Sequence, residues 1–207
     1  MSAAEFEPCV KGNTLALLIQ EAQAALKQGT VFQQALRSLS SGLQELVKHR
    51  SLANEWYPVS YYSELAELLC AQSAVGREAY LRELGVKDFA RLQRASTYRQ
   101  LEYLTHLEAQ RSLHTKLHDS KLITSFMSSI FNFSRWAPAP DPKSPKHMVI
   151  QVTDARHIPE AFRFLTEGFQ TAMNRTIKPE ARAVRSERPS PDLIIFRANG
   201  PKPIRGT

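Results

Sequence analysis

The fold is decided by residues 147–174, which read HMVIQVTDARHIPEAFRFLTEGFQTAMN. The apolar run at 147–152 predicts a short β-strand. Pro159 suits the first turn of a helix. The helix predicted over 159–174 carries apolar side chains at helical spacing, namely Phe162, Leu165, Phe169 and Met173. This stretch therefore predicts a strand followed by a helix whose apolar face covers other apolar residues.

Two further strands are predicted after this helix. Residues 181–185 alternate like a half-exposed strand, and the apolar run 193–196 ends at Asn199-Gly200. A turn is expected between them at 187–191, which reads ERPSP. The order strand–helix–strand–strand predicts a small antiparallel sheet with the helix on one face.

The N-terminal part of the chain is expected to be helical. No proline occurs between Pro58 and Pro138, and this stretch is rich in Leu, Ala, Glu, Arg and Gln. We expect three helices to begin at good N-caps, a short helix between two glycines, and a longer helical region thereafter. The positions are Asn13, Thr30 and Ser60 for the caps, Gly76 to Gly85 for the short helix, and Lys87 onward for the last region. The fold class predicted is α+β, with this helical part packed on the small sheet.

Prolines divide the two parts. Four of them, Pro138, Pro140, Pro142 and Pro145, predict a connection over 138–146 that cannot continue a helix. A unit of about 50 residues has a marginal core on its own. We therefore expect one domain over 10–198, made of a helical part (10–137), this connection and an α/β part (147–198), between flexible ends at 1–9 and 199–207.

Several classes of protein are excluded by what the sequence lacks. Its 8 glycines form neither a dinucleotide fingerprint nor a phosphate-binding loop, and no Gly-x-Ser-x-Gly or His-Glu-x-x-His occurs. Two cysteines, Cys9 and Cys70, cannot build a disulfide framework. No signal pattern and no apolar run of about 20 residues is found. These observations predict a cytoplasmic protein that is not an enzyme and has no membrane partner.

Positive charge is concentrated toward the C-terminus. The net charge is +7, and from Lys143 onward 12 Lys/Arg stand against 6 Asp/Glu, a balance of +6. A solvated surface is the favoured interpretation, and contact with nucleic acid or another anionic partner is the alternative. The candidate contacts for an anion or a nucleic acid are Arg156, Arg182, Arg185 and Arg188.

Histidines and aromatic residues are the other candidates for a site. His106, His114 and His118 would share one face of a continuous helix, but a metal site needs a supporting shell, so solvated histidines are the preferred interpretation and no metal is predicted. The aromatic residues form two groups that either line an apolar pocket or partner groove or form a core seam, which is the favoured interpretation. The candidates are Trp56, Tyr57 and Tyr61 in one group and Phe126, Phe131 and Trp136 in the other.

Three features together resemble a known group of proteins. They are Val10-Lys11-Gly12, Trp56-Tyr57-Pro58 before a helix with Tyr and Leu, and Gly168 within the late helix. They resemble a paralogous family that is abundant in myxobacteria and has no established activity. That family is similar in outline to the haem-nitric-oxide-binding domains and the four-vinyl-reductase ligand-binding domains. The resemblance spans roughly residues 10–198.

The resemblance implies a ligand-binding fold without its haem chemistry. Haem-nitric-oxide-binding domains hold the haem propionates with Tyr-x-Ser-x-Arg, and the matching positions here are Val152, Asp154 and Arg156. Both cysteines precede residue 71, whereas the vinyl-reductase group carries a cysteine-bearing C-terminal segment. We therefore expect no cofactor and a non-enzymatic regulatory module that senses a small apolar ligand or binds a protein partner. A nucleic-acid-binding regulator is the alternative.

Overall fold

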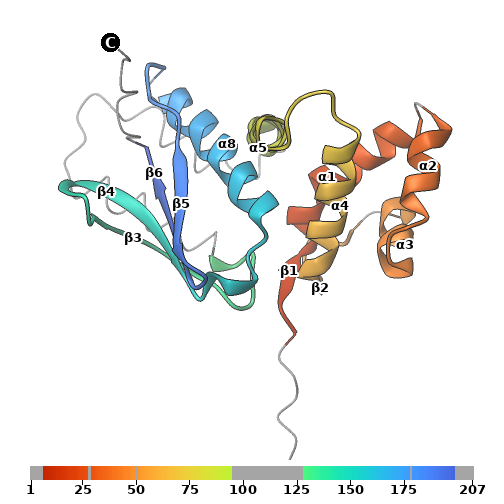
Figure 1. Cartoon of the computed structure of the whole chain (residues 1–207), viewed down its shortest axis with the longest axis horizontal. Helices are drawn as coiled ribbons and strands as arrows, with labels where there is room; N and C mark the ends of the chain where they lie inside the picture. Colours follow the sequence, from red (N-terminus) through yellow and green to blue (C-terminus); the bar gives the residue numbers. More distant parts are fainter. Residues whose placement is uncertain (1–6, 28, 50, 95–127, 178, 199–207) are drawn as a thin grey trace, which may run out of the picture.

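Helices occupy the N-terminal part of the chain and a β-sheet the C-terminal part (Figure 1). The computed structural model describes residues 7–27, 29–49, 51–94, 128–177 and 179–198. Their elements are β1 (Cys9–Lys11), α1 (Gly12–Leu26), α2 (Thr30–Leu36), α3 (Ser41–His49), β2 (Trp56–Pro58), α4 (Val59–Ala71), α5 (Arg77–Arg94), β3 (Arg135–Asp141), β4 (Ser144–Thr153), the 3-10 turn η2 (Ala155–His157), α8 (Glu160–Ile177), β5 (Arg185–Ser190) and β6 (Leu193–Arg197). The mixed helix and sheet class predicted from the sequence is confirmed. Within the described ranges, none of the helices combines the length and the apolarity that crossing a bilayer would require.

The helical part differs from the prediction at two places. The stretch expected as one helix from Thr30 is divided into α2 and α3, which are separated by residues 37–40. The short helix expected to end at Gly85 instead continues as α5 to Arg94. Gly85 lies against α8, where a side chain would not fit, so it serves a helix crossing rather than a helix end.

The connection predicted over 138–146 is wrong, because this stretch forms the end of β3, the turn and the start of β4. The sheet has four strands in the order β3-β4-β6-β5, all antiparallel, instead of the three predicted. Pro138 and Pro140 are tolerated because β3 is an edge strand, where the missing amide hydrogens need no partner. They also protect this edge against pairing with another chain.

The strand predicted at 181–185 is also wrong in position. The strand β5 begins at Arg185 and includes most of the expected turn. Two side chains of α8 set this position. The Thr171 hydroxyl accepts a hydrogen bond from the Val184 amide at 2.9 Å, and the Glu167 carboxylate accepts one from the Ser186 amide at 2.9 Å. Because both acceptors are far away in the sequence, local alternation could not predict where β5 begins.

The two parts share one hydrophobic core. In Figure 1, α8 lies between the sheet and α5, and α1 and α4 lie beyond α5. Phe162 of α8 joins the parts, since its ring lies 5.4 Å from the Tyr62 ring of α4 and 4.8 Å from the Phe131 ring. The Trp136 ring of β3 lies 6.3 Å from Phe162 and stacks on Phe196 of β6. Aromatic contacts therefore fill the space between the helices and the sheet.

Candidate functional site

Described residues of the helical part form an open groove. It lies between α3 and the junction of β2 with α4 and has a volume of about 360 Å³, in the range of small-molecule sites. Apolar groups make most of its wall, and a carboxylate and an imidazole stand beside them. The lining residues are Gly42, Glu45, Leu46, His49, Tyr57, Pro58 and Tyr61.

Helical spacing on α3 creates one wall of this groove. Gly42, Leu46 and His49 follow one another at the i, i+4 and i+7 positions of a helix, so they share one face. A Cβ atom at Gly42 would lie 2.1 Å from the hydroxyl oxygen of Tyr61. The absence of a side chain at Gly42 therefore lets the Tyr61 ring reach across to α3.

The strand β2 and its hydrogen bonds position the second tyrosine. Strand β2 pairs antiparallel with β1, with Tyr57 opposite Val10. The Tyr57 hydroxyl accepts a hydrogen bond from the Leu52 amide at 3.1 Å and donates one to the Glu55 carboxylate at 3.2 Å. The strand pairing holds the backbone of Tyr57 and these two bonds hold its hydroxyl, so the ring is fixed at both ends.

Charged groups stand at the rim of the groove. The Glu45 carboxylate lies 2.7 Å from the Lys48 ammonium and 3.3 Å from the His49 imidazole. The hydrogen bond from Lys48 lowers the pKa of Glu45, so this carboxylate is ionised at neutral pH. A second carboxylate, that of Glu64, accepts a hydrogen bond from the Ser40 amide just before α3.

The aromatic residues considered for either a core seam or a pocket lie in different places. Tyr57 and Tyr61 line the groove, whereas Phe131 and Trp136 pack in the core between the helices and the sheet. Trp56 is 45% exposed, and the Lys11 ammonium lies 5.3 Å from the centre of its ring. Phe126 lies outside the described residues.

Sequence reasoning missed the α3 half of the groove. Gly42, Glu45, Leu46 and His49 belong to it although they form no recognisable motif. Their helical spacing was the available signal, but the same spacing equally describes a helix packed on a core. The partners across the groove come from residues 57–61, and only tertiary structure brings them together.

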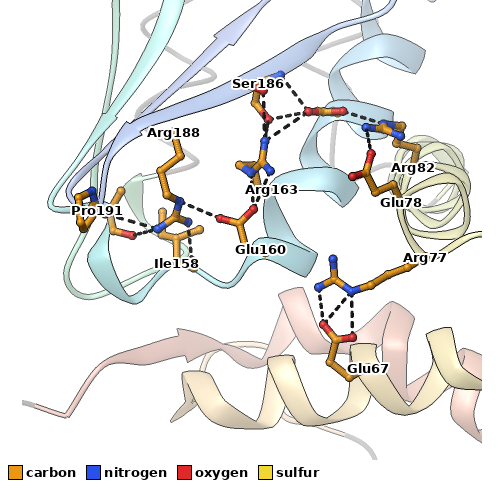
Figure 2. A network of polar contacts seen from close by, with 12 residues as sticks. Glu67, Arg77, Glu78, Arg82, Ile158, Glu160, Arg163, Ser186, Arg188 and Pro191 are labelled. Carbon is orange, nitrogen blue, oxygen red and sulfur yellow. Dashed lines mark hydrogen bonds and ion pairs between the residues drawn. The ribbon is translucent and has the colours of Figure 1, made fainter.

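A network of arginines and glutamates connects α4, α5, α8 and β5 (Figure 2). Arg77 of α5 is bonded to Glu67 of α4, which lowers the pKa of Glu67. Arg82 of α5 donates a 2.7 Å hydrogen bond to Glu167 of α8, whose side chain is 1% exposed. Buried charges require such partners, so this network ties the helical part to the sheet by side-chain bonds.

The arginines predicted to contact an anion mostly have carboxylate partners. Arg156 lies 3.0 Å from Asp192, and Arg188 lies 2.8 Å from Glu160 while donating to the backbone oxygens of Ile158 and Pro191 (Figure 2). Arg185 lies 3.9 Å from the Glu167 carboxylate, and Arg182 is exposed. These intramolecular pairs reduce the charge that three of the four arginines could offer to phosphates.

Nucleophile and metal chemistry have little support among the described residues. Burial raises the pKa of the Cys70 thiol to about 11, so it is protonated at neutral pH. Burial also raises the pKa of the Cys9 thiol. No group of three or more His, Cys, Asp or Glu side chains that could hold a metal occurs in the described ranges. The candidate ligands His106, His114 and His118 lie outside them.

The side chains at the positions matching the haem-propionate motif are either buried or in contact with other charged side chains of this chain. Val152 is buried in the hydrophobic core. Asp154 has a left-handed backbone with φ 54°, and its carboxylate lies 3.5 Å from Arg135. Arg156 donates two hydrogen bonds to Asp192, at 3.0 and 3.2 Å. Val152 and Asp154 offer no hydrogen-bond donor to a propionate, and Arg156 already contacts Asp192, so this stretch does not fit a haem held by the full motif.

Comparisons with known proteins identify the fold. No protein-family model matches the sequence, and no curated protein matches it. A variant of Tt H-NOX is similar, with a TM-score of 0.55 and 11% identity over 90% of this chain and 94% of that one. The unliganded Fe(II) H-NOX protein from K. algicida has a TM-score of 0.51 at 11% identity, with the same coverage of both chains. The chain therefore has the fold of H-NOX domains.

Proposed function

We propose that this chain is a non-enzymatic regulatory module of the H-NOX fold, which binds a small apolar ligand or a segment of a protein partner. The observation that carries this proposal is the groove between α3 and α4, with apolar walls and a few convergent polar groups. The free thiols of Cys9 and Cys70 agree with action in the cytoplasm.

The ligand proposed is not a haem bound through the strand motif. The names of the similar structures mention Fe(II) and haem, but the fold alone carries no ligand over to this chain. Arg156 would have to leave Asp192 before it could reach a propionate, and Asp154 would repel that group. The groove lined by Tyr57 and Tyr61 is separate from this stretch.

Nucleic-acid binding is the less supported alternative. It rests on the +6 balance after Lys143, which remains a property of the sequence. Among the described residues after Lys143, several arginines already contact carboxylates, as in Arg188 with Glu160 and Arg197 with Asp141. Paired arginines contribute less to the counterion release that drives such binding.

Titration with the neutral apolar dye Nile red tests the proposal. We expect saturable binding of one dye per chain, and weaker binding by Leu46→Gln and Tyr61→Ala because both remove apolar wall. The matched control is Val86→Gln on α5, which makes the same kind of change at another partly exposed position. Melting curves confirm that each variant is folded. Equal binding by Leu46→Gln and Val86→Gln would refute the groove as the site.

A further inference from the structure

We infer that the occupant of the groove is an extended polypeptide segment of a partner that inserts an arginine or lysine side chain. This inference rests on the proposed function, because it names the partner of the same groove. Its basis is the combination of the Glu45 carboxylate with the tyrosine rings in the wall.

One carboxylate lines the groove, and two more are bonded to residues in or near its walls. Glu45 lines it, Glu55 is bonded to the Tyr57 hydroxyl, and Glu64 is bonded to the Ser40 amide two residues before Gly42. The chain as a whole carries a net charge of +7, and the Glu45 carboxylate now contacts Lys48 and His49, so a cationic partner would compete with these two side chains for it. A cationic partner is complementary to this site even though it is repelled by the chain at long range.

The walls suit a long cationic side chain. Arginine and lysine bury an apolar stem while the charged head stays near a polar or charged group. Leu46, Pro58 and the tyrosine rings can cover such a stem, and the ring faces attract a cation. The chain itself contains a neighbouring example, since the Lys11 ammonium lies over the Trp56 ring.

The cation that now contacts Glu45 is easily displaced. The side chains of Lys48 and Glu45 are 56% and 59% exposed, and ion pairs at such exposure contribute little to stability. An incoming guanidinium can replace Lys48 at Glu45 and also bind in a bidentate geometry that an ammonium cannot adopt.

Exposed apolar residues nearby favour a polypeptide over a free amine. Leu52 is 62% exposed and Trp56 is 45% exposed, and both belong to the segment that carries Tyr57. Exposed large apolar side chains that adjoin a groove are typical of protein interaction sites. A segment that spans the groove and this edge would cover surface that a single amine leaves in water.

The test uses the full chain and a fluorescein-labelled nine-residue peptide of alternating arginine and proline, followed by fluorescence anisotropy. Proline keeps the peptide extended and lowers the entropy lost on binding. Matched peptides carry glutamate or glutamine in place of arginine. Because the net charge of +7 attracts acidic peptides nonspecifically, a preference for the basic peptide must come from the local site. We expect the basic peptide to bind at least about tenfold more tightly than the acidic peptide, and we expect its affinity to fall as the salt concentration is raised.

Two substitutions locate the binding. Glu45→Gln should weaken basic-peptide binding about threefold to tenfold, because it removes the carboxylate in the groove. Glu83→Gln, the same change at an exposed position on α5, should leave the affinity unchanged. Equal affinities of these two variants, or equal binding of the acidic and basic peptides, would overturn the inference.

Competition separates this inference from the proposed function. If Nile red binds the groove but the basic peptide does not displace it, the inference fails and the proposed function stands. If neither dye nor peptide binds, both fail. Displacement by free arginine amide at the same concentration as the peptide would overturn the choice of a polypeptide partner.

Discussion

Gly85 of α5 and Gly168 of α8 bring the backbones of these two helices into direct contact. A Cβ atom at Gly85 would lie 1.9 Å from the Leu165 carbonyl oxygen, and one at Gly168 would lie 1.9 Å from the Arg82 carbonyl oxygen. Two reciprocal contacts of this kind leave no room for a side chain on either helix. The α5–α8 crossing is therefore the closest link between the helical part and the layer that covers the sheet.

Substitution at this crossing should destabilise the protein. Gly168→Ala places a methyl group against backbone that cannot move aside, so we expect a loss of about 1–3 kcal/mol and a lower melting temperature. The control is Gly76→Ala, where a Cβ atom would meet nothing within 4 Å. Circular dichroism recorded during heating gives the melting temperatures of both variants. Equal melting temperatures of the two variants would contradict the predicted clash.

Phe162→Ala should destabilise the helical part and the sheet together. Its ring contacts rings from both parts, and removing a buried phenylalanine side chain costs about 3–5 kcal/mol. Trp56 and Trp136 are the two tryptophans of the chain and lie in different parts, so single-tryptophan variants report on each part. We expect coincident unfolding transitions in denaturant. Separate midpoints for the two reporters would disprove the prediction of one domain over 10–198.

Acid should weaken the end of the sheet that Arg197 holds. Arg197 lies 3.0 Å from Asp141 and 2.7 Å from Glu187, and Lys143 bonds to both acids, which lowers their pKa values below the ordinary 3.8 and 4.5. Their stabilisation is therefore present above pH 4.5 and is lost as the pH falls through the lowered values. In denaturant titrations from pH 7 to pH 3, Asp141→Asn should lose less stability than the unchanged protein. An identical loss would rule out this cluster as a source of acid sensitivity.

Haem should not bind in a stoichiometric complex through the strand motif. The reason is that neither Val152, which is buried and apolar, nor Asp154, which is a carboxylate, can donate a hydrogen bond to a propionate. Expression with added haem, followed by absorbance spectroscopy, should give no stoichiometric Soret band. A stoichiometric band that is lost on mutating His106, His114 or His118 would show that a haem is held from outside the described residues.

Duplex DNA should bind weakly and dissociate at moderate salt, since Arg156 and Arg188 are paired within the chain. The variant Asp192→Asn releases Arg156 and should strengthen this binding modestly, as measured by anisotropy at low salt. Tight binding of one DNA sequence by the unchanged protein at physiological salt would instead favour the nucleic-acid alternative.

The local sequence was enough to predict α8, α4 and β6, because apolar spacing within each segment indicates its structure. The helix α8 carries its apolar stripe and begins one residue after Pro159, and α4 begins within one residue of the predicted position, although Ser60 lies inside the helix. The strand β6 coincides with the apolar run at 193–196 to within one residue. Apolar spacing acts within one or two turns, so the sequence alone reports it, whereas the caps predicted at Asn13, Thr30 and Ser60 are wrong because the N-cap positions are Lys11, Gly29 and Pro58.

Tertiary structure decided what depends on distant partners. Pro138 lies in a strand because β3 is at an edge of the sheet, and Gly85 continues a helix because α8 passes against it. The groove likewise exists only because the Tyr61 hydroxyl reaches Gly42 across two separate helices. Proline and glycine determine which backbone conformations and close approaches are possible at their own positions. The elements that pack against those positions come from residues far along the chain, so the local sequence does not reveal them.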